Sequence, residues 1–132
     1  MNKNFFLITF LIIVLDQITK FLLTNVSFGI FNYTTNTGAA FSLFQEYTNF
    51  LIIVSILVIV LILYYYKKYP KYWLGLSFVL GGTLGNLIDR IFLGYVTDFI
   101  SVGSWWPSFN IADSANTVGV MLLLYRLMKD KK

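Results

Sequence analysis

The hydrophobic residues of this chain are gathered into long stretches instead of being scattered. Four such stretches run through the sequence: Phe5–Leu23, Phe50–Tyr66, Trp73–Phe92 and Ile111–Met128. Each holds about 17–20 residues and, as a helix, would be roughly 25–30 Å long, close to the thickness of the apolar core of a bilayer. The pattern predicts an all-α integral membrane protein with four transmembrane helices, in which residues 1–132 form a single domain.

The first stretch needs to be distinguished from a secretory signal, because Lys3 precedes its apolar run. It ends in Leu15-Asp16-Gln17, whereas a signal ends in small residues around a cleavage site. We therefore expect it to be a retained transmembrane helix.

The positive charges predict how these helices are oriented. Eight of the ten Lys and Arg residues lie near the two termini and in the middle connection, at Lys3, Lys67, Lys68, Lys71, Arg126, Lys129, Lys131 and Lys132. The connections at about 24–49 and 93–110 contain none. Because cytoplasmic loops carry an excess of Lys and Arg, both termini should face the cytoplasm (N-in/C-in) and the two longer connections should face outward.

The net charge of +4 then has a simple interpretation. Basic residues beside transmembrane helices are attracted to anionic lipid headgroups. We therefore expect membrane lipids, and no nucleic acid, among the partners of this chain.

The composition agrees with a membrane protein and restricts its chemistry. Apolar residues make up 58% of the chain and charged residues 12%, about half the share in soluble proteins. There is no histidine and no cysteine. Ser-His-Asp and Cys-His catalysis, histidine-bound zinc or haem and thiolate-bound metals are therefore excluded. Any enzymatic chemistry falls to carboxylates, hydroxyls, amides and the few cations.

Several polar residues lie inside the predicted helices, where each charge costs roughly 2.5–3.5 kcal/mol. Asp16 and Lys20 are four residues apart, so one interpretation is an intrahelical ion pair. In the third stretch, Asn86 precedes Asp89 and Arg90, and the glycines before them would permit close helix packing. A glycine-lined packing face with a polar helix end is the alternative to a functional cluster.

Two further aspartates lie at the outer side. Asp98 follows in the segment VTDFI, and a single loop aspartate is usually solvated. Asp113 begins the fourth stretch, where Asn110 and Asp113 resemble a capping box. Without histidine or cysteine, however, two neighbouring carboxylates that share a proton are the well-understood means of hydrolysis, with a peptide bond as a natural target. We therefore consider Asp98 and Asp113 a candidate catalytic pair.

Five segments in order resemble the signature blocks of one family, the bacterial signal peptidase II (lipoprotein signal peptidase) family. These segments are Asp16–Lys20, Asn36–Ser42, Gly81–Arg90, Val96–Phe99 and Phe109–Asp113. The resemblance implies an aspartic endopeptidase of the bacterial cytoplasmic (inner) membrane, with its active site at the extracytoplasmic face. Its substrates would be prolipoproteins whose cysteine carries diacylglycerol, and it would cut just before that cysteine.

The resemblance also implies roles for individual residues. Asp98 and Asp113 would be catalytic, Asn36, Asn86, Arg90 and Asn110 would shape the pocket and hold substrate, and Asp16, Lys20 and Asp89 would be supporting polar residues. A small β-sheet cradle and a short helix would lie above the membrane, in the region 27–45. We expect no metal, no cofactor and a monomeric enzyme.

Two other classes of protein compete with this interpretation. A small transporter or channel could use Asp16, Lys20, Asp89 and Arg90 as an ion path. That class favours charges near the middle of the membrane and often an internal repeat, whereas this chain has an apolar inner half and no repeat. A structural membrane subunit would leave the outer polar segments unexplained.

Overall fold

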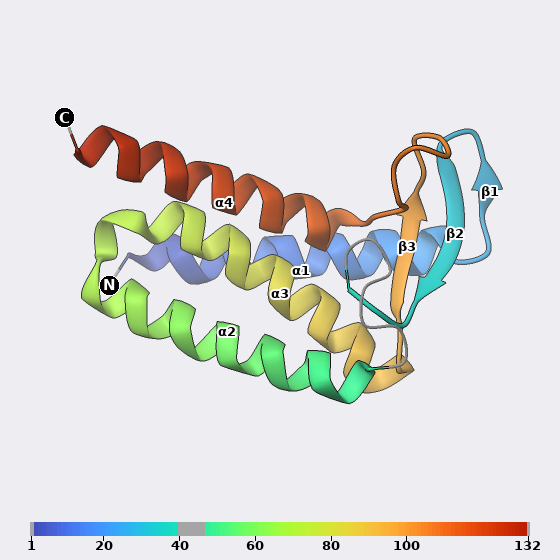
Figure 1. The fold of residues 1–132 in the computed structure, drawn as a ribbon, viewed down its shortest axis with the longest axis horizontal. Helices are drawn as coiled ribbons and strands as arrows, with labels where there is room; N and C mark the ends of the chain where they lie inside the picture. Colours follow the sequence, from blue (N-terminus) through green and yellow to red (C-terminus); the bar gives the residue numbers. More distant parts are fainter. Residues whose placement is uncertain (1, 40–46, 132) are drawn as a thin grey trace.

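The computed structural model describes residues 2–39 and 47–131. Four long helices lie alongside one another, a small sheet lies beyond one end of them, and both chain ends lie at the opposite end (Figure 1). The elements in chain order are α1 (Lys3–Leu23), β1 (Ser27–Phe28), β2 (Phe31–Asn36), α2 (Thr48–Lys68), the 3₁₀ turn η2 (Pro70–Tyr72), α3 (Trp73–Leu93), β3 (Val96–Ile100) and α4 (Ile111–Asp130).

The four helices coincide with the four predicted apolar stretches. Within the described residues, three of them are long and apolar enough to cross a membrane: α1, α2, and α3 together with η2. Helix α4 has a similar length of 20 residues but is not among the three. Its sequence explains this, because it begins with the polar segment around Asp113 and ends with Lys129 and Asp130.

Helix α3 lies at the centre of the bundle and packs against α1, α2 and α4. Glycines permit this, as the sequence predicted. A Cβ atom on Gly81 would lie 2.8 Å from Ile12 of α1, and one on Gly82 would collide with the carbonyl oxygen of Ala112 in α4. A side chain at either position would therefore force the helices apart.

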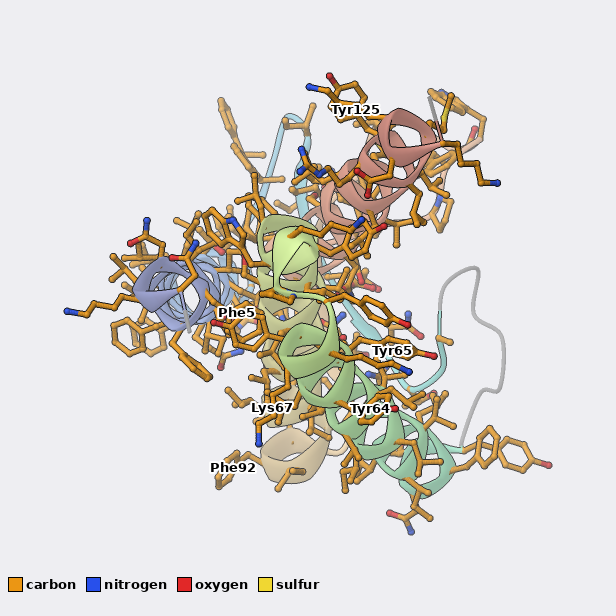
Figure 2. All side chains as sticks on the ribbon, turned by 90° about the vertical axis from the view of Figure 1, so that its left-hand side faces the viewer. Phe5, Tyr64, Tyr65, Lys67, Phe92 and Tyr125 are labelled. Carbon is orange, nitrogen blue, oxygen red and sulfur yellow. The ribbon has the colours of Figure 1, made fainter. Side chains whose placement is uncertain are left out.

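The outer surface of the bundle is apolar. Figure 2, seen from the end that carries the termini, shows Phe92, Tyr64 and Tyr125 pointing away from the helices, whereas Phe5 is buried and stacks on Tyr66 with ring centroids 3.8 Å apart. Phe92 is 81% exposed. Large apolar side chains exposed around a bundle of this length are suited to contact with lipid.

The sheet is antiparallel in the order β1-β2-β3. Strands β1 and β2 lie in the region where the resemblance implied a β-sheet. The third strand comes from the other outer connection, and its register places Asp98 opposite Thr34 of β2. The expected short helix does not occur in residues 27–39, and residues 40–45 of that region lie outside the described residues. That part of the fold prediction therefore stays untested.

Candidate active site

The two candidate catalytic aspartates are brought together by the chain returning from β3 to α4. Phe109 pairs with Ile100 of β3, so that Asn110 lies beside the strand before α4 begins. Asp98 in β3 is 2% exposed and Asn110 is fully buried. The interpretation of Asp98 as a solvated loop aspartate is therefore wrong.

Asn110 contacts both aspartates. Its side-chain Nδ2 donates to Asp98 Oδ1 at 2.8 Å, while its Oδ1 accepts from the backbone N–H of Asp113 at 2.8 Å. The backbone N–H of Asn110 donates in turn to Asp113 Oδ2 at 3.2 Å. The predicted capping box is confirmed. It also holds the two carboxyl groups in a defined relation, so the capping and functional interpretations of Asp113 are compatible.

Both aspartates line one large pocket of about 1210 Å³. Asn36, Asn86 and Arg90 line it as well. Five of the six residues proposed for the pocket and its chemistry therefore line this pocket, and all of these except Asp113 come from β2, α3 or β3. The pocket continues away from the sheet between α2, α3 and α4, where it is bordered by Val54, Ser55, Val58, Thr83, Asn116, Thr117 and Val118. The carboxyl groups therefore lie at the sheet end of an elongated, mostly apolar space.

Asn86 connects the pocket to the buried charges behind it. Its Nδ2 donates to Asp113 Oδ1 at 2.9 Å. Its Oδ1 accepts from Asn110 Nδ2 at 3.1 Å and from Lys20 Nζ at 3.1 Å. The predicted pocket residue Asn86 thus joins the candidate pair to the predicted supporting residues.

The supporting residues Asp16, Lys20 and Asp89 form one buried ionic cluster. Lys20 Nζ lies 2.7 Å from Asp16 Oδ2 and 3.1 Å from Asp89 Oδ2. The intrahelical ion pair is therefore confirmed, but Lys20 also bridges α1 to α3. All three side chains are at most 5% exposed.

This cluster also holds the backbone beside each candidate catalytic residue. Asp16 Oδ1 accepts from the backbone N–H of Ala112 at 2.8 Å, one residue before Asp113. Asp89 Oδ2 accepts from the backbone N–H of Thr97 at 2.9 Å, one residue before Asp98. The buried cluster consequently positions both the start of α4 and strand β3.

Asn36 and Arg90 organise the chain that follows β2. Arg90 Nη2 donates to the carbonyl oxygen of Gly38 at 3.1 Å. Asn36 Oδ1 accepts from the backbone N–H of Gly38 at 2.9 Å, and its Nδ2 donates to the carbonyl oxygen of Ala39 at 3.2 Å. Residues 40–42 of this predicted block lie outside the described residues.

The surroundings of Asp98 favour its protonated form. Burial, followed by the negative charge of Asp113, raises the pKa of Asp98 to about 7, against the opposing effects of hydrogen bonds from Asn36 and Asn110 and the charge of Lys20. A carboxyl group with this pKa can hold or release a proton near neutral pH, which is the requirement for acid–base chemistry.

One residue of the cluster was not assigned a role from the sequence. Gln17 Nε2 donates to the carbonyl oxygen of Gly85 at 3.1 Å and lies within hydrogen-bond distance of Asp16 Oδ2 and Asp89 Oδ1, at 3.2 and 3.0 Å. An amide inside an apolar stretch was the available signal, but its partners Gly85 and Asp89 lie 68 and 72 residues away along the chain. Among the described residues, no group of three or more acidic, histidine or cysteine side chains is arranged to hold a metal ion.

Comparisons with known proteins agree on one family. The sequence profile described as "Signal peptidase (SPase) II" matches residues 8–129. A lipoprotein signal peptidase of Thermodesulfovibrio yellowstonii is 38% identical, with 91% of each chain covered, and one of Dehalococcoides mccartyi is 45% identical, with 92% of this chain and 88% of the other covered. A solved structure described as a bacterial membrane enzyme matches with a TM-score of 0.90 at 30% identity, covering 98% of this chain and 90% of that one.

Replacement of Lys20 tests the ionic cluster. Lys20→Met leaves the buried carboxylates of Asp16 and Asp89 without their cation, and breaking a buried ion pair in this way typically costs about 3–5 kcal/mol. We expect a large decrease in the free energy of unfolding measured in detergent. The control is Lys71→Met, which breaks the half-exposed bridge to Asp130 and should have little effect. Equal, small effects of both substitutions would contradict a positioning role for the cluster.

Proposed function

The chain belongs to the signal peptidase II family, and on this premise we propose that Asp98 and Asp113 are its catalytic pair. It is an aspartic-type membrane peptidase that cleaves signal peptides from lipoprotein precursors. The finer proposal is that it cuts just before a cysteine that already carries diacylglycerol. Asn36, Asn86, Arg90 and Asn110 are proposed to shape the pocket and hold this substrate.

The observation that carries the catalytic proposal is the position of Asn110 between the two carboxyl groups. Through its side chain and backbone it contacts Asp98 and Asp113 at the same time, in a pocket that both aspartates line. Two carboxyl groups held close together do not both ionise easily, so they titrate as a pair and share a proton.

The mechanism follows from that shared proton. The ionised carboxylate removes a proton from a water molecule as the water attacks the scissile carbonyl carbon. The protonated carboxyl group donates a hydrogen bond to the carbonyl oxygen and stabilises the negative charge that develops on it. The proton is then delivered to the leaving nitrogen when the C–N bond breaks. Asn86 donates a hydrogen bond to Asp113 Oδ1 from the pocket wall, and Lys20 supports Asn86 from behind.

We further propose that all four helices span the bacterial inner membrane, with both termini in the cytoplasm and the sheet on the outer side. Helix α4 has the length of a span and runs alongside α3. Its outer face carries exposed apolar side chains: Val120, Met121, Leu124, Leu127 and Met128. With the sheet outside, the aspartates lie near the outer interface, where a lipid-bearing cysteine keeps its acyl chains in the bilayer.

We also propose a single-domain enzyme that acts as a monomer, a proposal supported by the fact that one chain supplies both aspartates and the pocket around them. The ion-path alternative has no support, because Lys20 is held between Asp16 and Asp89 and buried among protein groups. Within the described residues, the four charges of that alternative are gathered near one end of α1 and α3, with Asp16, Lys20 and Asp89 behind the pocket and Arg90 in its lining.

Substitution of either aspartate by asparagine tests the catalytic pair. Asp98→Asn and Asp113→Asn retain the size of the side chain but remove the shared proton and the carboxylate. We expect each variant to insert and fold, and to lose cleavage by about 10³-fold or more because neither carboxyl group functions without the other. Cleavage is measured with a synthetic diacylglyceryl-modified precursor, and in cells as accumulation of the uncut, lipid-modified form.

Asp130→Asn is the matched control, because Asp130 lies at the opposite end of α4 and pairs with Lys71. It should process the precursor at the wild-type rate. Normal processing by Asp98→Asn or by Asp113→Asn would end the proposal.

The pH dependence follows from the raised pKa of Asp98. Loss of the shared proton at higher pH leaves two carboxylates and no hydrogen-bond donor, so kcat/KM should fall as the pH rises above about 7. Stability also falls as the pH rises, but over a lower range, because the raised pKa stabilises the folded state fully below the ordinary value of 3.8 and this contribution is lost progressively up to about 7. The free energy of unfolding of Asp98→Asn should not show this part of the decrease, because asparagine does not titrate. An activity that is constant or rising from pH 7 to 9 would contradict the assignment.

The orientation can be tested with single cysteines, since the chain has none. Ser104→Cys lies in the exposed connection between β3 and α4, and Lys131→Cys lies after α4. In intact spheroplasts, a membrane-impermeant maleimide should label Ser104→Cys, and it should label Lys131→Cys only after lysis. The opposite labelling would mean that the proposed topology is reversed. Labelling of both variants in intact spheroplasts would mean that α4 does not span the membrane.

A further inference from the structure

One polar side chain in the pocket has a buried atom without a partner. Asn116 lies three residues after Asp113 in α4 and lines the same pocket. Its Oδ1 is buried and accepts no hydrogen bond from the residues that the structure describes. Neither the family resemblance nor the catalytic mechanism above assigns Asn116 any role.

The other amides around the aspartates differ in this respect. Asn86 and Asn110 each donate and accept hydrogen bonds within the site, and Gln17 donates to the ionic cluster. A buried polar atom without a partner lowers the stability of the folded protein, more so where lipid replaces water. An apolar side chain of the same size would avoid this cost, so the packing of α4 alone does not account for an asparagine.

The neighbouring helix leaves room for the Asn116 amide. It lies over Gly82 of α3, where a Cβ atom would come within 2.5 Å of Asn116 Oδ1. Ser55 of α2 and Thr83 of α3 border the same part of the pocket. The pocket is thus polar at a level deeper than the aspartates, although it continues between apolar side chains such as Val54 and Val58.

A bound precursor brings unpaired groups to this level. The peptide must be extended near the scissile bond, because a helical backbone shields its carbonyl groups from attack. Each extended residue exposes an N–H and a C=O that have no water to bind at membrane depth. Asn116 Oδ1 is buried against Gly82, so rotation about the Cβ–Cγ bond is needed to turn it to the pocket. The amide carries both a donor and an acceptor, and can therefore pair with either group of a peptide unit.

The position of Asn116 indicates which peptide unit it meets. Three residues along a helix correspond to about 4.5 Å, so Asn116 lies about that much deeper than Asp113. An extended peptide advances about 3.3 Å per residue, so this depth corresponds to between one and two residues from the scissile bond. With the signal peptide entering from the membrane, these residues are the ones that precede the cut.

We propose that Asn116 is a substrate-binding residue whose amide hydrogen-bonds one of the two peptide units that immediately precede the scissile bond. This inference rests on the proposed function. It assigns the deeper part of the pocket to the backbone of the signal peptide, so that recognition there depends little on side-chain identity.

The test combines a variant of the enzyme with a modified substrate. In the synthetic precursor, each of the two peptide units before the scissile bond is replaced in turn by an ester, which lacks the N–H and has a weaker acceptor. The enzymes are the wild type, Asn116→Leu and Asn116→Ala, with Asn4→Leu as the matched control at an exposed position near the start of α1. An ester placed beyond the cysteine is the control substrate.

For the wild type, one of the two esters should lower kcat/KM by about fivefold, the effect of one neutral hydrogen bond. Asn116→Leu and Asn116→Ala should show a similar loss with the all-amide precursor, mainly as a higher KM, and no further loss with that ester. Asn4→Leu should behave as the wild type. Asn116→Leu should unfold at the same temperature as the wild type or at a higher one, because it removes a buried acceptor without a partner.

Three results would overturn the inference. In the first, the ester lowers kcat/KM by the same factor in the wild type and in both Asn116 variants. In the second, neither ester affects the wild type, which cleaves all precursors alike. In the third, both variants unfold at a lower temperature and lose activity equally on every precursor, which indicates a structural role. If the wild type fails to cleave even the all-amide precursor, the proposed function itself is wrong and this inference falls with it.

Discussion

The arrangement of the site depends on one buried ammonium group. Lys20 Nζ lies between the carboxylates of Asp16 and Asp89, and each carboxylate accepts a backbone N–H beside one of the catalytic candidates. The chain thus uses the strongest polar interaction available in an apolar interior to align a strand with a helix. Without Lys20, the carboxylates of Asp16 and Asp89 would be two uncompensated buried charges. The three side chains must therefore stay in contact for the fold to be stable.

Amide side chains orient the reacting groups of this site. Asn110 and Asn86 donate to Asp98 and Asp113, and both are fixed in turn by backbone groups or Lys20. Amides do not titrate near neutral pH, so only the aspartates respond to it. Burial raises the pKa of Asp98 and so places its response near neutral pH.

The four helices could be predicted because their signals are local, whereas the proposed roles of most site residues came from the resemblance to a family. Apolar length predicted the helices, and a charge within an apolar stretch marked Asp16 and Lys20. Strand β3 could not be predicted in this way, since five residues around Asp98 carry no sign that they pair with β2. The bonds of Gln17 and the unpaired oxygen of Asn116 were equally inaccessible, because both depend on where α1 and α4 approach the glycines of α3.

Residue types and apolar length indicated the class of protein and the chemistry open to it. Hydrophobic length and composition can be read from the sequence without knowing which residues are neighbours in space. The lack of histidine and cysteine likewise excludes histidine- and cysteine-dependent mechanisms whatever the fold. The long-range contacts of the fold were needed to show that Asp98 is buried in a strand and not solvated in a loop, and that the capping box of α4 also joins the catalytic candidates. Burial and hydrogen bonding depend on neighbours that are distant along the chain, so no local pattern contains them.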